Sequence, residues 1–147
     1  MRAVVTRVRS ANVKISGKTV GEIERGFLVL LGIGPEDTEA QADRLASKIC
    51  NLRVFEDENG KMNRSLTDVG GSLLVVSQFT LYADFQSRRP GFSRAARPDI
   101  AEPLYEYFME QCSQKGFTPQ HGQFGADMAV ESVNDGPVTL LMDTDTL

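Results

Sequence analysis

Few side chains in this sequence could carry out the chemistry of a conventional hydrolase. The 147 residues include one histidine, His121, and two cysteines, Cys50 and Cys112. A Ser–His–Asp or Cys–His arrangement would have to use His121, which has no carboxylate or nucleophile beside it in the sequence. Two cysteines and one histidine also cannot complete a common zinc site. We therefore expect no metal, no cofactor, a surface or locally bonded histidine, and two buried thiols that pack as small hydrophobes.

Arginines, in contrast, are concentrated in one short segment. Residues 86–98 read Gln-Ser-Arg-Arg-Pro-Gly-Phe-Ser-Arg-Ala-Ala-Arg-Pro and contain no acidic residue. Guanidinium groups donate paired hydrogen bonds to phosphate oxygens, so the segment is a candidate anion contact, although a solvated loop explains it equally well. The whole chain has 16 basic and 20 acidic residues and a net charge of −4. This negative net charge excludes a protein that coats long nucleic acids. It is compatible with a small contact to one nucleic-acid end.

Polar residues follow directly from a strongly apolar segment. Residues 72–77 are predicted to form a buried strand, and Ser-Gln-Phe-Thr-Leu at 77–81 continues from it. A buried polar group without a partner costs about 1–3 kcal/mol, so these side chains either face a cavity or satisfy one another. Both a binding site at the strand end and a structural cluster fit these residues.

Gly-Ile-Gly at 32–34 has only part of a phosphate-binding glycine pattern. Asp37 stands where the third glycine belongs, and a carboxylate there would repel a pyrophosphate. We therefore interpret this segment as an ordinary turn between a strand and a helix.

The remaining pattern predicts a sheet-rich α+β domain. Thr38 and Gln41 form a capping box that begins a helix of about four turns. Asp99 is expected to cap a second helix, with Ile100, Leu104, Phe108 and Cys112 on its inner face. Asn-Asp-Gly-Pro at 134–137 consists of residues typical of a turn between two strands. From the residues alone its Gly–Pro bond is expected to be trans, because cis X-Pro bonds are uncommon. The predicted strands are residues 2–9, 13–15, 20–23, 27–31, 72–77, 128–133 and 138–142.

We expect one domain over residues 1–147, with an antiparallel-rich, barrel-like sheet and two main helices over one layer. The first ten residues mix charged with apolar side chains and offer no signal-peptide core. The longest apolar run, residues 27–33, is too short to cross a membrane. Cysteines without a spacing motif fit a reducing compartment. The chain is therefore expected in the cytoplasm, without a membrane partner.

Two segments carry a resemblance to a known family. Ser-Gln-Phe-Thr-Leu at 77–81 and Asn-Asp-Gly-Pro-Val-Thr at 134–139 are similar to the signature motifs of the D-aminoacyl-tRNA deacylases. The resemblance covers essentially the whole chain and includes Gly-Lys-Met-Asn at 60–63, Arg-Pro-x-Phe at 89–92 and Phe-x-Ala-Asp-Met at 124–128. One departure is Gly91, where family members often carry serine.

The resemblance implies a cytoplasmic homodimer that hydrolyses the ester between a D-amino acid and the 3′-terminal ribose of tRNA. It also implies that the Gly136–Pro137 bond is cis and that this pair reaches into the partner subunit's pocket, where its carbonyl oxygens hold the substrate's amino group. An L side chain would then collide with the main chain. Glycine has no side chain to exclude, so glycyl-tRNA should also be hydrolysed.

The resemblance also assigns roles to individual residues. Gln78, Phe79 and Thr80 are the expected catalytic residues, with the N–H groups of Phe79 and Thr80 as oxyanion donors and Gln78 supporting the pocket wall. The substrate-binding residues are Ser77, Gly136, Pro137, Phe124 and Met128, of which Phe124 and Met128 are expected to pack on the terminal adenine. Thr80 has no evident base to activate it, so we favour assistance by the tRNA's own 2′-hydroxyl over an acyl-enzyme.

Two other functions remain open from the sequence. One is a non-catalytic protein that binds an RNA end with the same pocket. The other is the related editing domain that clears misacylated tRNA-Thr, which is normally fused to a synthetase.

Overall fold

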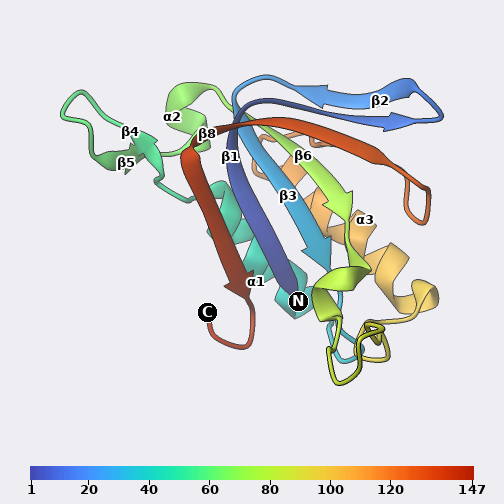
Figure 1. Ribbon diagram of the computed structural model, residues 1–147. Helices are drawn as coiled ribbons and strands as arrows, with labels where there is room; N and C mark the ends of the chain where they lie inside the picture. The colour runs from blue at the N-terminus through green and yellow to red at the C-terminus, as the bar shows by residue number, and fades with distance from the viewer.

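The computed structural model describes residues 1–147 and shows a curled sheet with two long helices packed behind it (Figure 1). The elements in chain order are β1 (Arg2–Ile15), β2 (Lys18–Ile23), β3 (Gly26–Gly32), α1 (Glu39–Cys50), β4 (Phe55–Glu56), β5 (Met62–Arg64), α2 (Leu66–Val69), β6 (Ser72–Ser77), η1 (Phe79–Tyr82), α3 (Pro98–Gln114), β7 (Gln120–His121) and β8 (Ala129–Asp143). The main sheet has the order β2-β1-β3-β6-β7, and β8 also pairs with β1.

Long-range pairing curls the main sheet into a nearly closed barrel. β1 pairs antiparallel with β2, β3 and β8, whereas the β3–β6 and β6–β7 pairs are parallel. The two ends of the strand order meet where Glu22 donates its N–H to Gln120 Oε1 at 3.4 Å. A Cβ atom on Gly21 would lie 2.7 Å from the carbonyl oxygen of His121, so glycine permits this approach. The predicted α+β fold with a barrel-like sheet and two main helices is confirmed.

Two hydrophobic cores lie on opposite faces of this sheet. Phe27, Val29 and Leu31 of β3 belong to the larger core of 24 buried residues, which also contains the inner faces of α1 and α3. Leu28 belongs to a second core of seven buried residues. Because β3 contributes to both cores, it is buried on both of its faces. Each fully buried side chain of this size contributes about 1.5–3 kcal/mol, so β3 is a firm support for its neighbour β6.

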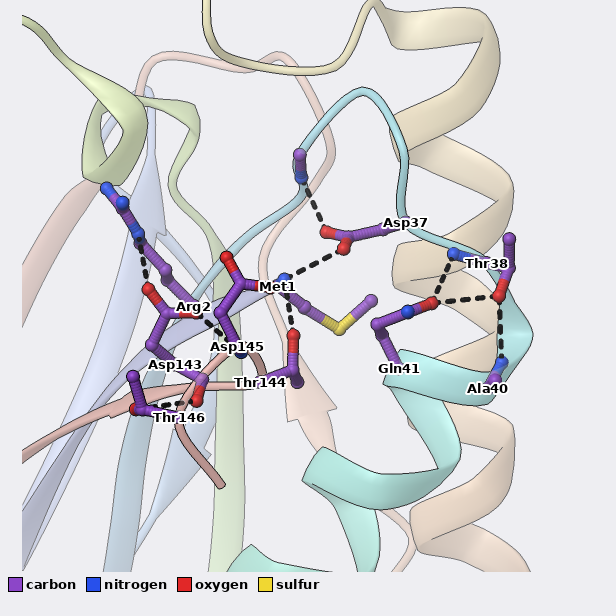
Figure 2. A network of polar contacts seen from close by, with 11 residues as sticks. Met1, Arg2, Asp37, Thr38, Ala40, Gln41, Asp143, Thr144, Asp145 and Thr146 are labelled. Carbon is purple, nitrogen blue, oxygen red and sulfur yellow. Dashed lines mark hydrogen bonds and ion pairs between the residues drawn. The ribbon is translucent and has the colours of Figure 1, made fainter.

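The turn between β3 and α1 is built around the chain's N-terminus (Figure 2). The ammonium group of Met1 donates to Asp37 Oδ1 at 2.9 Å and to Thr144 Oγ1 at 2.8 Å. The other Asp37 oxygen accepts the Gly34 N–H at 2.6 Å. Asp37 therefore closes the turn and binds the N-terminus, which confirms the interpretation of this segment as a strand-to-helix turn. The predicted capping box of α1 follows directly.

Helix α3 begins two residues earlier than predicted. Its N-cap is Arg97, and no side chain caps it, so the predicted capping by Asp99 is wrong. The reason is Pro98, whose fixed φ and missing N–H suit the first helical position. Ile100 is consequently 37% exposed instead of facing inward, whereas Leu104 and the other predicted inner residues are buried. Neither α3 nor any other helix is long and apolar enough to span a membrane.

The prediction of two C-terminal strands is also wrong, because β8 is one continuous strand. On β1, Thr6 and Val8 are two residues apart, whereas their β8 partners Thr139 and Asn134 are five apart. The three additional residues form a bulge, which lets the turn-forming segment stay within the strand. The Gly136–Pro137 bond in this bulge is cis, as the family resemblance implies and against the base rate.

Candidate functional site

A cavity of about 570 Å³ lies at the end of β6. Parallel pairing brings the end of β3 beside Ser77, and the Gln78 N–H extends this ladder by donating to the β3 main chain at 2.8 Å. The chain then turns into η1, so that Ser77, Gln78 and Phe79 line the cavity together. Phe124 and Met128, from the segment before β8, line it as well. Five of the eight predicted site residues are thus brought together.

Thr80 does not line this cavity. Its hydroxyl oxygen accepts a hydrogen bond from Gln78 Nε2, and both side chains are half-buried. The two alternatives left open by the sequence are therefore both realised in part: the strand end lines a cavity, and two of its polar side chains satisfy each other.

Two main-chain donors in the turn that follows β6 have no acceptor within the chain. They are the N–H groups of Phe79 and Thr80, the first two residues of η1. In a 3₁₀ turn the first N–H groups have no carbonyl partner within the helix, and the side chain of Gln78 does not cap them. The turn that ends β6 therefore presents two adjacent hydrogen-bond donors suited to a negatively charged oxygen.

Sequence reasoning did not assign Phe92 and Arg97 to the site, although both line the cavity. Phe92 packs edge-on against Phe79, with ring centroids 5.1 Å apart. The segment reaches the cavity because the buried Ala96 donates its N–H to the Ile33 carbonyl at 2.9 Å. The signal that could have found Phe92 was the Arg-Pro-x-Phe segment of the resemblance.

Gly136 and Pro137 do not line this cavity. Both are exposed, and their bulge lies beside Arg7, which pairs with Phe27 of β3. The cavity begins four residues further along β3, at Leu31, a distance of roughly 13 Å along the strand. In Figure 1, the bend in β8 lies at the opposite end of the sheet from the turn that follows β6. The chain's own Gly136–Pro137 pair is therefore separate from its own cavity.

A buried arginine holds the bulge, and sequence reasoning missed it. The side chain of Arg7 is 6% exposed, and its Nε lies 3.4 Å from Asp135 Oδ2. The same nitrogen donates to the Asp135 carbonyl at 3.2 Å, and Nη1 donates to the carbonyl of Val54. The available signal was that Arg7 stands among the apolar residues of the first predicted strand. A charge buried there would need a partner, because buried charges are nearly always paired.

The other titratable candidates take no part in the cavity. His121 is exposed, and its Nδ1 lies 2.6 Å from the Gly122 carbonyl oxygen, which confirms a locally bonded histidine. Both cysteines are buried, as predicted, and they form no disulfide. Burial raises the pKa of Tyr105 to about 12, and its hydroxyl donates to the Val75 carbonyl at 3.0 Å. No three His, Cys, Asp or Glu side chains are placed to hold a metal ion.

Known proteins resemble this chain over its full length. The family described as D-Tyr-tRNA(Tyr) deacylase matches residues 4–143. The proteins named D-aminoacyl-tRNA deacylase from Thermosipho africanus (strain TCF52B) and Clostridioides difficile (strain 630) are each 57% identical over 145 residues, which cover 98% of this chain and 97% of each relative.

Solved structures agree with this match. One described as "c-Myc DNA Unwinding Element Binding Protein" has a TM-score of 0.91 and 43% identity, over 97% of this chain and 98% of that chain. Another, described as "Structural Analysis of a probable eukaryotic D-amino acid tRNA deacylase", is 15% identical and has a TM-score of 0.84, over 96% and 97% of the two chains, and so shows the shared fold. Matched along nearly its entire length, the chain belongs to the D-Tyr-tRNA(Tyr) deacylase family.

Proposed function

We propose that this chain hydrolyses the ester between a D-amino acid and the 3′-terminal ribose of tRNA, releasing the D-amino acid and the tRNA. The observation that carries this proposal is the full-length match to proteins named for that substrate. The cavity supports it, because about 570 Å³ is within the usual range for small-molecule sites. The reaction belongs in the cytoplasm, where charged tRNA is used.

In this proposal, main-chain groups stabilise the transition state. Water adds to the ester carbonyl carbon, and the N–H groups of Phe79 and Thr80 bind the oxygen that becomes negative. The bond to the ribose 3′-oxygen then breaks, and that oxygen takes up a proton. Gln78 supports the cavity wall, and Ser77 fixes the strand end. This arrangement suffices because an aminoacyl ester is already activated and is held in position.

The tRNA's terminal 2′-hydroxyl assists the attacking water. The residues that line the cavity include no His, Cys, Asp, Glu, Lys or Tyr, so no side chain there can act as a general base. Thr80 is not the nucleophile, since its hydroxyl is hydrogen-bonded to Gln78 and lies outside the cavity lining. Phe124 and Met128 offer apolar surface on which the terminal adenine packs.

A second copy of the chain completes the site. The Gly136–Pro137 pair of one subunit inserts into the cavity of the other, where its carbonyl oxygens bind the substrate's α-amino group. Exposed apolar residues on the same strand support this arrangement, because Val133 is 53% exposed and Leu141 77% exposed. With amino group and ester both held, an L side chain meets the main chain, whereas a D side chain or glycine does not.

The test is release of tyrosine from D-tyrosyl-tRNA by the purified chain. Hydrolysis many times faster than the spontaneous rate is expected. A non-catalytic RNA-end binder predicts binding of the same tRNA without acceleration, and that result would remove the proposal.

A further inference from the structure

The loop that follows η1 is anchored beside the cavity by main-chain hydrogen bonds. Asp84 and Gly91 bond through both of their main-chain groups, at 2.8 and 3.0 Å, and so close a small loop between them. The buried Ala96 then fixes the returning segment to the end of β3. Figure 1 shows this segment, in olive and yellow, at the end of the sheet where η1 lies. We call residues 84–97 the arginine loop.

The positive charges of the arginine loop have few partners in the chain. All four arginines are exposed. Arg97 approaches Asp99 at 3.7 Å, and both side chains are largely in solvent. No salt bridge or side-chain hydrogen bond involves the other three guanidinium groups, whereas Arg2, Arg7 and Arg64 elsewhere are each paired with a carboxylate. The unpartnered arginines are Arg88, Arg89 and Arg94.

Exposed aromatic side chains lie both at the cavity and in the arginine loop. Phe79 is 54% exposed and Phe92 is 39% exposed, although both also line the cavity. Phe85, at the start of the arginine loop, is 77% exposed. Nucleic-acid bases without pairing partners stack on such side chains, while adjacent arginines bind the backbone. Arg97 links the loop to the cavity, because it lines the cavity and is the last residue of the loop.

We propose that the arginine loop binds the phosphates of the single-stranded acceptor end of tRNA, with a base stacked on Phe85. This inference rests on the proposed function, which brings the terminal adenosine into the cavity. Charge complementarity identifies the occupant, because four arginines stand in residues 86–98, which contain no acidic residue, in a chain of net charge −4. One of them, Arg97, lines the cavity. The basic surface is short, which fits a strand end and not a long duplex.

The test compares two substrates and two variants. Arg88, Arg89 and Arg94 are replaced together by Gln, and Arg97 is left in place because it lines the cavity. A control protein carries Lys→Gln at three exposed lysines outside the loop. The substrates are D-tyrosyl-tRNA and the D-tyrosyl ester of adenosine, which has the reacting ester but no phosphate. Binding of uncharged tRNA is measured in parallel from low to high salt. The control lysines are Lys18, Lys48 and Lys61.

We expect kcat/KM of the arginine variant to fall at least tenfold for D-tyrosyl-tRNA and to remain unchanged for the adenosine ester. The slope of log affinity for tRNA against log salt should flatten by roughly 2–3, since each lost phosphate contact removes about 0.7–0.9. The lysine control should retain wild-type values.

Three results would overturn the inference. Equal tRNA binding and salt slope in the arginine variant and the wild type would show that the loop does not contact phosphate. Loss of activity on both substrates would show that the loop only supports the cavity. Equal losses in the arginine and lysine variants would show that tRNA binding depends on the overall charge of the protein and not on the loop. Failure of the proposed function is distinct, because the unmodified chain would then hydrolyse neither substrate, and tRNA binding would still decide the role of the loop.

Discussion

At the scale of single residues, Thr80 distinguishes a side-chain mechanism from a main-chain mechanism. Thr80→Ala removes one neutral hydrogen bond, to Gln78, worth about 1 kcal/mol. We therefore expect the single-turnover rate on D-tyrosyl-tRNA to stay within about tenfold of wild type, with Thr80→Ser closer still. A loss of several thousandfold, or a D-tyrosyl adduct on Thr80 found by mass spectrometry, would show that Thr80 is a nucleophile.

Asp37 is predicted to matter for stability because it pairs with the buried N-terminus (Figure 2). Asp37→Asn leaves the Met1 ammonium without a counter-charge and should lower the free energy of unfolding by about 3 kcal/mol. Thr144→Val removes only a neutral partner of the same ammonium and should lower it by about 1 kcal/mol. Urea unfolding of the two variants measures both values. Equal, small effects would mean that the ion pair contributes nothing.

At the scale of elements, the sequence predicted those helices and strands that depend on interactions between residues close together in the chain. The capping box fixed the start of α1, and apolar runs identified β3 and β6. The β8 prediction failed because turn-forming residues normally end a strand, whereas here the long strand β1 pairs with β8 on both sides of the bulge. The two-residue strand β4, the three-residue strand β5 and the four-residue helix α2 were missed, since segments this short have no readable period.

β8 is also where the proposed dimer can be tested. Leu141→Glu places a charge on an apolar residue that is 77% exposed, and Val20→Glu does the same on β2, where Val20 is 45% exposed. By analytical ultracentrifugation, the wild type and Val20→Glu should sediment at twice the 16.2 kDa chain mass. Leu141→Glu should sediment as a monomer and lose deacylation. An active wild-type monomer would contradict the shared site.

At the scale of the whole molecule, the sequence predicted only the part of the site that a single chain forms. Five of the eight predicted residues line one cavity, since a single turn and one nearby segment bring them together. The position of the Gly136–Pro137 pair could not be derived from local patterns, because it depends on how β8 bends along β1 and, in our proposal, on a second copy. The role of Arg7 was hidden for a similar reason: its partner Asp135 is 128 residues away.

The absence of a general base in the cavity lining leads to a prediction about the substrate. D-tyrosyl-tRNA that ends in 2′-deoxyadenosine should be bound with unchanged affinity but hydrolysed at least a hundredfold more slowly, because general-base assistance typically contributes about 10²–10⁴. Single-turnover rates on the two substrates provide the measurement. Equal rates would require a base from the protein.

The most direct test of the whole account is the ratio of deacylation rates on D-tyrosyl-tRNA and L-tyrosyl-tRNA, measured with the same enzyme and the same tRNA. We predict rapid release of D-tyrosine, release of L-tyrosine no faster than in buffer, and hydrolysis of glycyl-tRNA as well. Equal rates for D and L, or a preference for L as expected of a synthetase editing domain, would contradict selection by main-chain exclusion.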